Sequence, residues 1–353
     1  REREIRAFVK TPFYRVVSSI ALEGESFEGE WRAVEGSRYF QSPVLYKENG
    51  FKKKEDAQKL ICELSTQQPL ICTVEKIERK KENKNPPLLF NLAELQNVCS
   101  KLFKISPDET LSIVQDLYEK KLVTYPRTDA RVLSTAVAKE IYKNISGLRN
   151  YPQAGEAAQG ALELGAYKNI AKTRYTNDKQ ITDHYAIIPT GQGLGALKGL
   201  SLTAQRVYET IVRRFLSIFY PPAVYQKVSL VTKMENESFF SSFKVLLSEG
   251  YLKIAANSFA KKSMAEASGK TPESEGEGEV SCDEALLAAL QKLKKGDILN
   301  INGLGIKEGE TSPPKRYNSG SMILAMENAG QLIEDEDLRS QIKGSGIGTS
   351  ATR

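Results

Sequence analysis

The sequence predicts a multidomain α+β protein in which a β-rich domain carries an inserted helical domain. Strand-like runs of β-branched and aromatic residues lie on both sides of a central stretch whose apolar residues recur with helical spacing. Pairs of prolines mark both changes of pattern, at 86–87 and at 221–222. A chain of 353 residues also exceeds one typical domain, which has about 150 residues. We therefore expect a β-rich domain from 1–85 and 221–309, a helical domain over 86–220, and part of another helical domain over 310–353.

The first part of the β-rich domain is expected to contain two strands and a helix. Residues 13–22 and 70–74 predict the strands, because both runs are apolar, rich in β-branched residues and bounded by Pro, Gly or charged residues. Between them, residues 54–64 (KEDAQKLICEL) predict an amphipathic helix. The polar segment 83–87 (NKNPP) then ends this part of the domain.

The helical domain begins with a well-defined predicted helix over 107–120. Ser106 and Glu109 have the spacing of a capping box, and Pro107 takes the first helical position. A short β-branched run follows at 122–125, where Pro126 ends it. Further helices are expected at 134–145, 155–165 and 203–219.

After the second proline pair the strand patterns return. Strands are predicted at 224–233, 239–247 and 251–255. Residues 261–284 are acidic with Ser and Gly interspersed, which predicts a flexible surface excursion. A final helix is expected over 321–328, followed by a glycine-rich turn at 344–348.

Charge is distributed unevenly along the chain. The net charge is only +6, but residues 120–150 contain seven basic and two acidic side chains. Lys120, Lys121 and Arg131 lie in this stretch, and such a local excess suits a nucleic-acid backbone. A solvated helix face would give the same pattern, and charge alone favours that interpretation.

The cysteines and the hydropathy indicate the compartment. Four cysteines lie far apart with no C-x-x-C pair, which argues against a zinc ribbon or a disulfide-bonded scaffold. We therefore expect a reducing, cytoplasmic location, associated with the nucleoid if the partner is DNA. No run approaches the roughly 18 apolar residues of a membrane span, so no membrane partner is expected.

Tyr125, Pro126 and Arg127 form a candidate reactive group. Pro126 biases Tyr125 towards an extended conformation, in which residues two apart project to the same side. A phenol beside a guanidinium can attack a phosphodiester while the cation stabilises charge on the phosphorus oxygens. By itself the pattern is not specific, since most of the 15 tyrosines must be structural.

Four stretches of the sequence have the character of motifs. They are 1–8 (REREIRAF), 117–129 (LYEKKLVTYPRTD), 183–190 (DHYAIIPT) and 313–353, which runs from PPKRY through AMEN to GIGTSATR. In the same order, these stretches resemble the motifs of type IA DNA topoisomerases, and four collinear matches are much more specific than any one of them. Residues 183–190 resemble the family's H-H-A-I-I-P-T element, which points to the topoisomerase III branch. The sequence departs from the family at two positions, because Tyr185 replaces the second His of that element and Ser350 replaces the usual Pro of the last motif.

The resemblance implies a fold and a set of roles. The fold is the type IA arch, with a β-rich hinge domain, an inserted helical domain bearing the tyrosine, and part of a helical domain that binds single-stranded DNA. Tyr125 is implied as the nucleophile that forms a 5′-phosphotyrosine, Arg127 as a contact of the scissile phosphate, and His184 as a residue that arranges the site. Expected DNA contacts are Lys120, Lys121, Arg131, Thr349, Thr352 and Arg353.

The resemblance also implies parts outside this sequence. The family's acidic, Mg²⁺-binding cluster lies in a toprim domain ahead of the first matched motif. We therefore expect a central fragment that is inactive alone, with Mg²⁺ serving the intact enzyme and no metal site on this chain. The sequence has no G-x-x-x-x-G-K-[ST] loop, which agrees with an ATP-independent reaction.

Two other functions fit parts of the sequence. A non-catalytic clamp for single-stranded DNA would keep the architecture without cleaving a strand. A tyrosine recombinase or a type IB enzyme would need several Arg and His residues around its nucleophile, and a chain with a single His argues against it.

Overall fold

A computed structural model describes residues 1–66, 68–260, 279–281, 284–333, 339 and 346–348. The chain divides into two compact units, both built from several chain segments. The barrel unit comprises 1–83, 224–248 and 262–315, and the helical unit comprises 84–223, 249–261 and 316–353. The protein is therefore a mixed α/β chain, as the sequence predicts.

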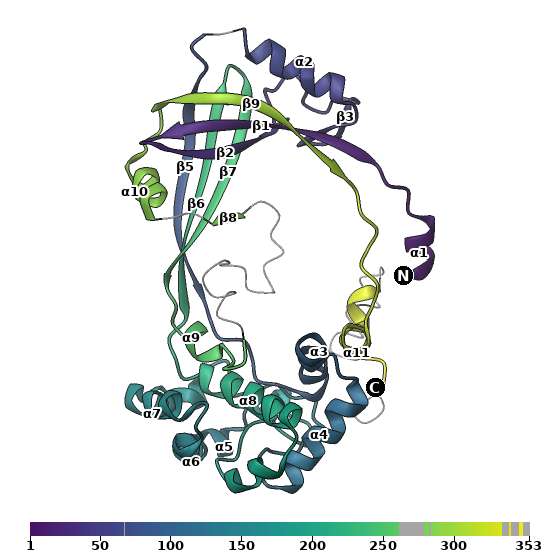
Figure 1. Cartoon of the computed structure of the whole chain (residues 1–353), viewed down its shortest axis with the longest axis vertical. Helices are drawn as coiled ribbons and strands as arrows, with labels where there is room; N and C mark the ends of the chain where they lie inside the picture. Colours follow the sequence, from purple (N-terminus) through teal and green to yellow (C-terminus); the bar gives the residue numbers. More distant parts are fainter. Residues whose placement is uncertain (67, 261–278, 282–283, 334–338, 340–345, 349–353) are drawn as a thin grey trace. The chain divides into compact units, whose positions relative to one another are not determined.

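The barrel unit is built on one nine-stranded sheet. Its order is β2-β7-β6-β5-β9-β1-β4-β3, and the ninth strand, β8, pairs with β7. Because β2 also pairs with β1, six of these strands close into a ring. Figure 1 shows β1 and β9 running side by side, with Val16 opposite Ile306 in their antiparallel register. The strands are β1 (Pro12–Leu22), β2 (Glu25–Arg32), β3 (Leu45–Lys47), β4 (Gly50–Phe51), β5 (Ile71–Lys84), β6 (Ala223–Met234), β7 (Glu237–Ser248), β8 (Glu279–Ser281) and β9 (Ile298–Glu310).

The core of the barrel unit follows from side-chain alternation. In β1, Val16 and Ile20 are buried while Ser19 between them is exposed, as the two-residue period of a strand requires. Trp31 stacks on Phe51 with ring centroids 4.9 Å apart. Helices α2 (Lys54–Leu64) and α10 (Glu284–Lys292) add apolar side chains to the same core. The short helix α1 (Glu2–Ala7) buries none of its residues.

The helical unit is packed around the long helix α8. This helix buries one apolar face, which includes Val207, Ile211 and Phe215, because these residues recur at four-residue intervals. Its helices are α3 (Leu92–Phe103), α4 (Pro107–Glu119), α5 (Thr135–Glu140), α6 (Tyr142–Gly147), α7 (Gly155–Leu164), α8 (Leu202–Ser217), α9 (Leu252–Ala255) and α11 (Ser319–Glu327). Short 3₁₀ turns cover Leu148–Asn150, Ala166–Lys172, Asp178–Gln180, Leu194–Gly199 and Ala329–Leu332.

Most predicted elements are confirmed. The helix at 54–64 has the predicted bounds, and the predicted helix at 107–120 is α4, whose Ser106 side chain accepts the Glu109 N–H. The predicted helix at 134–145 is two helices, α5 and α6. The short β-branched run at 122–125 forms one isolated bridge, between Val123 and Pro189.

The predicted strand at 251–255 is wrong, because this segment turns back on the helical unit as α9. Gly250 has a φ of +50°, and a Cβ there would lie 2.4 Å from the Pro222 carbonyl oxygen. Tyr251 is buried, and its N–H donates to the Pro221 carbonyl. Further along, the buried Glu209 carboxylate of α8 accepts hydrogen bonds from the Ser258 N–H and hydroxyl. The segment that follows β7 is therefore bound to α8, and residues 252–255 form the helix α9 instead of a strand.

Two predicted features lie largely or wholly outside the described residues. The acidic excursion at 261–284 falls there except for β8 and the first residue of α10. Of the glycine-rich turn at 344–348, the structure describes only 346–348, where the Ile347 N–H donates to the Met326 carbonyl at the end of α11.

Candidate active site

Tyr125 lies between two other rings in the helical unit. The centroid of the His184 ring is 4.4 Å from that of Tyr125, with the planes tilted by 43°. On another side, the Tyr118 ring meets the Tyr125 ring edge to face, at 5.5 Å and 82°. Tyr118 belongs to the last turn of α4, and Tyr125 follows in an irregular segment. The structure therefore brings the predicted nucleophile and the predicted histidine together, although 59 residues separate them in the sequence.

Two threonines fix the backbone on both sides of the Tyr125-Pro126-Arg127 segment. The Thr124 hydroxyl donates to the Ala186 carbonyl and accepts the Ile188 N–H, both at 3.0 Å. The Thr128 hydroxyl donates to the His184 carbonyl at 2.8 Å and accepts the Ala130 N–H at 3.1 Å. Thr128 is almost fully buried, so its hydroxyl depends on these protein partners, and their loss would be costly. The threonines therefore hold the tyrosine segment against the segment that carries His184.

The histidine-bearing segment, 184–190, is itself anchored to the core of the helical unit. The Ile187 N–H donates to the Phe90 carbonyl at 2.8 Å, and the Ala186 N–H donates to the Val132 carbonyl at 3.0 Å. The apolar side chains of 186–188 are buried. Asn144 of α6 donates through its side-chain amide to the Pro189 carbonyl. The His184 side chain is exposed at the beginning of this fixed segment, which leaves its ring accessible from solvent.

Arg127 and Pro126 have different environments. Pro126 is buried, whereas Arg127 is half-buried. Among the described residues, no hydrogen bond or ion pair is assigned to the Arg127 guanidinium. A planar cation with five N–H donors, two residues beyond the phenol, is suited to bind a phosphate diester.

The three basic residues predicted to contact DNA differ in their surroundings. Lys120 is exposed and forms an ion pair with Asp116 on α4. Lys121 is exposed, and its φ of +61° ends the turn after α4. Arg131 is half-buried; its Nε donates to the Leu89 carbonyl, and Glu94 lies 3.8 Å from its guanidinium. Arg131 therefore has a structural role in joining two chain segments, while both lysines have side chains at the surface.

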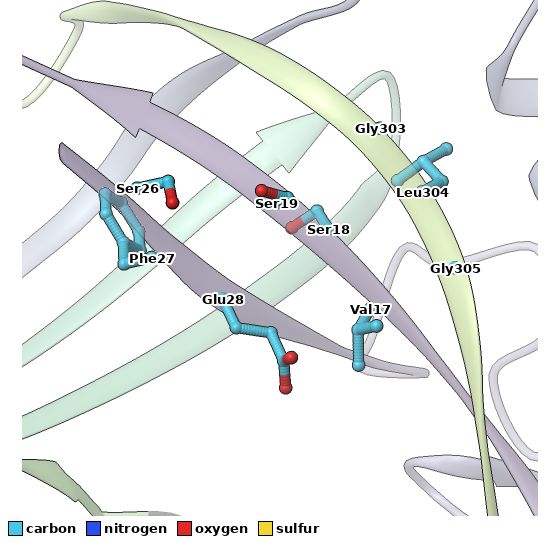
Figure 2. A pocket seen from close by; sticks show the side chains of 9 residues that line it. All are labelled: Val17, Ser18, Ser19, Ser26, Phe27, Glu28, Gly303, Leu304 and Gly305. Atoms are coloured by element: carbon cyan, nitrogen blue, oxygen red, sulfur yellow. The ribbon is translucent and has the colours of Figure 1, made fainter. Parts of the chain in front are cut away.

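Thr349, Thr352 and Arg353 lie outside the described residues. Within the described part of the chain, no group of three or more His, Cys, Asp or Glu side chains is arranged to hold a metal ion. An open cavity of about 460 Å³ lies on β1, β2 and β9 of the barrel unit, and it contains none of the predicted site residues (Figure 2).

Sequence reasoning missed part of the site. The sequence patterns assign no role to Thr124 or Thr128, and they include Tyr118 in a motif without giving it a role. The signal was the placement of threonines one residue before Tyr125 and one residue after Arg127. Their function depends on carbonyls about 60 residues away, which local patterns do not reveal.

Comparison with known proteins identifies the family. A family model described as DNA topoisomerase matches residues 1–353. The chain belongs to the DNA topoisomerase family. This topoisomerase chain is 31% identical to the DNA topoisomerase 3 of Bacillus licheniformis and 30% identical to that of Bacillus subtilis, in both cases over 100% of this chain and 44% of the relative. The expected likeness to type IA topoisomerase III is confirmed.

A solved structure agrees with the family. The full-length topoisomerase I from Thermotoga maritima matches this topoisomerase chain with a TM-score of 0.58 and 20% identity, over 100% of this chain and 47% of that one. The match shows a shared fold. The chain thus spans about half the length of the relatives it matches. None of the described helices is long and apolar enough to cross a membrane.

Proposed function

We propose that this chain is the tyrosine-bearing part of a type IA DNA topoisomerase that cleaves one strand of DNA through Tyr125. The Tyr125 oxygen attacks a backbone phosphorus, an O–P bond forms, and the P–O3′ bond breaks. The phenol loses its proton and the departing 3′ oxygen gains one, so the product is a 5′-phosphotyrosine and a free 3′-hydroxyl. The observation that carries the proposal is the Tyr125 ring against His184, on a segment that ends in Arg127.

The neighbouring residues have complementary roles in this proposal. Arg127 binds the non-bridging oxygens of the scissile phosphate and stabilises their charge in the transition state. His184 lies against the phenol and orients it together with the DNA. Lys120 and Lys121 contribute positive charge for the backbone of a single strand. The ester formed has nearly the free energy of the one broken, so the reaction needs no ATP.

The whole protein would supply what the described residues do not contain. They form no acidic metal site, so no step is assigned to a metal on this chain. We propose that Mg²⁺ is held by a toprim domain and that this domain closes over Tyr125. Residues 1–353 alone are then expected to leave negatively supercoiled DNA unrelaxed in the presence of Mg²⁺. Strand passage would take place on DNA in the cytoplasm, at the nucleoid.

The experiment is a covalent-trapping assay on the full-length protein. A single-stranded oligonucleotide labelled at its 3′ end is incubated with protein and Mg²⁺, and the reaction is stopped with detergent. Because the downstream strand remains on the enzyme through its 5′ phosphate, label should migrate with the wild-type protein. Tyr125→Phe keeps the ring and removes the attacking oxygen, so its label should be lost, whereas Tyr142→Phe should behave as wild type.

The same assay separates the enzyme from a non-catalytic clamp. A clamp would bind the oligonucleotide in a filter-binding measurement but would retain no label after denaturation. It would also be indifferent to Tyr125→Phe. Label attached to a residue other than Tyr125 would refute the proposed nucleophile.

A further inference from the structure

A second tyrosine, Tyr118, contacts the ring of Tyr125. Its ring meets that of Tyr125 nearly at right angles, with the centroids 5.5 Å apart. This edge-to-face arrangement is favourable for aromatic pairs. The contact also restricts rotation of the Tyr125 ring about the side-chain bonds of Tyr125. His184 restricts the same ring from a second direction, at 4.4 Å and a tilt of 43°.

The two tyrosines differ in how firmly their backbones are held. Tyr118 belongs to α4, a 13-residue helix that is capped by Ser106 and anchored in the core by Val114 and Leu117. Tyr125 lies in a segment without regular secondary structure, where the threonines fix the backbone but leave the side chain its own torsions. A ring mounted on a rigid helix can therefore supply the orientation that the loop does not.

The connection between the two rings is tightly determined. The Lys121 N–H donates to the Tyr118 carbonyl at 2.8 Å, and the Leu122 N–H donates to the Leu117 carbonyl at 2.9 Å. Leu122 and Val123 are fully buried. The chain from α4 to Tyr125 thus has little freedom to change the distance between the rings.

We propose that Tyr118 is a positioning residue, which holds the Tyr125 phenol in the orientation for attack on the backbone phosphorus. This inference rests on the proposed function of Tyr125. The ring of Tyr118 performs this role and its hydroxyl does not, because the contact to Tyr125 is between rings. Restricting a nucleophile to its reactive orientation raises the rate of the chemical step and leaves the affinity for DNA unchanged.

The experiment compares single-turnover attachment with binding, in the full-length protein with Mg²⁺ and the 3′-labelled oligonucleotide. Tyr118→Ala should lower the attachment rate at saturating DNA by roughly 3- to 10-fold, the range expected for loss of an edge-to-face pair. Its dissociation constant for the oligonucleotide, from fluorescence anisotropy without Mg²⁺, should stay at the wild-type value. Tyr118→Phe retains the ring and should retain the rate.

Tyr142 provides a matched control. It lies on helix α6, its ring is paired with that of Tyr167 at 5.6 Å, and it is 49% exposed, compared with 39% for Tyr118. Tyr142→Ala should therefore leave the attachment rate unchanged. The comparison shows whether the loss in Tyr118→Ala comes from the contact with Tyr125 or from removal of any paired surface ring. A thermal melt of each variant verifies that the fold is kept.

Each other outcome overturns the inference. An unchanged rate for Tyr118→Ala would show that the ring does not position the phenol. Weaker DNA binding with an unchanged rate at saturation would make Tyr118 a platform for a DNA base instead. A loss in Tyr118→Phe equal to that in Tyr118→Ala would assign the effect to the hydroxyl. Failure of the proposed function is distinguished by Tyr125→Phe, since retained attachment there, or none in the wild type, refutes both.

Discussion

Thr128 shows how one side chain can determine the geometry of a site without touching the reacting atoms. Its hydroxyl donates to the carbonyl of His184 and accepts the N–H of Ala130. It thereby connects the end of the tyrosine segment to the backbone of the residue whose ring lies against Tyr125. This hydrogen bond therefore fixes the backbone that carries the imidazole relative to the backbone that carries the phenol.

The first prediction concerns this hydroxyl. Thr128→Val keeps the shape of the side chain but leaves the half-buried His184 carbonyl and the buried Ala130 N–H without their partner. We expect the unfolding free energy of the helical unit to fall by about 1–3 kcal/mol. The midpoint of urea denaturation, followed by circular dichroism, would measure the change. Thr128→Ser retains the hydroxyl and is the control; an equal loss in both variants would attribute the effect to packing of the methyl group.

Lys121 permits a test of the predicted DNA contact. Its φ of +61° lies in the region that favours glycine, so Lys121→Gly should alter stability by no more than about 1 kcal/mol. If the ammonium contacts a phosphate, Lys121→Gly should lower the affinity for single-stranded DNA. The slope of the logarithm of the binding constant against the logarithm of the salt concentration should also become shallower by about one.

The control for Lys121 is another lysine with the same backbone conformation. Lys104 ends α3 with a φ of +60°. Lys104→Gly should match Lys121→Gly in thermal stability while leaving DNA affinity and its salt slope unchanged. Equal affinities for the two variants would remove Lys121 from the DNA-binding surface.

At the scale of elements, α6 controls the position of the histidine-bearing segment. Asn144 binds the Pro189 carbonyl, and the backbone of α6 passes very close to Gly191. A Cβ on Gly147 would lie 2.2 Å from the Gly191 carbonyl oxygen. The two backbone segments can therefore approach this closely only because residue 147 has no side chain. The segment from His184 to Gly191 is thus held at both of its ends.

Gly147→Ala should therefore disturb the site from a distance. We expect the added methyl group to displace the loop at Gly191, lower the melting temperature and slow covalent attachment to DNA. Gly199→Ala is the control, because a Cβ at that position meets nothing within 4 Å. Unchanged melting and attachment in Gly147→Ala would show that the loop can shift without moving His184.

Prediction from the sequence succeeded where local signals decide the element. The helix at 54–64 and α4 follow from apolar spacing and, for α4, from its Ser106 cap. It failed where a long-range contact decides. The run at 251–255 resembles a strand, but Gly250 and the burial of Tyr251 turn it onto α8 as a helix. Strand β9 was not identified, since its glycines, such as Gly303 and Gly305, are unfavourable in strands.

The site was predictable in identity and not in geometry. The motif around Tyr125 identified the candidate nucleophile and its arginine, and a second motif identified His184. That the two rings would lie 4.4 Å apart depends on the pairing of distant backbones through Thr124 and Thr128. Arg131 shows where a local pattern misleads. Its place in a basic stretch predicts a DNA contact, but its side chain binds the Leu89 carbonyl and lies near Glu94.

At the scale of the whole molecule, each unit has a thiol in its core. Cys72 belongs to the core of the barrel unit, and burial raises its pKa to about 11. Cys99 belongs to the core of the helical unit, and burial raises its pKa to about 12. Cys62, in contrast, is exposed on α2. The thiols therefore report on the two units separately.

We predict that a thiol reagent at pH 8 labels Cys62 rapidly and leaves Cys72 and Cys99 unlabelled until their own unit unfolds. Pulsed labelling across a urea series, read by peptide mass spectrometry, would give one unfolding curve for each unit. Two curves that coincide would show that the units unfold together. Rapid labelling of Cys72 or Cys99 in native protein would contradict their burial.

The raised pKa values also predict the response to alkali. The folded protein favours the neutral thiols, so this contribution to stability is complete below the ordinary thiol pKa of about 8.5. It is lost as the pH rises through the folded values of about 11 and 12. Cys99→Ala should therefore reduce the alkaline loss of stability of the helical unit between these limits, as measured by urea midpoints at pH 8 and pH 11.

The route of the chain between its two units has a mechanical consequence. Strands β5, β6 and β7 are neighbours in the sheet, and all three continue directly into the helical unit, at Lys84, Ala223 and Glu249. The chain crosses once more at Lys315–Arg316, so a force that separates the units is shared by several crossings instead of being concentrated on one linker. A nick in any one of these crossings would leave the others intact, so the two units would stay tethered after a single proteolytic cut.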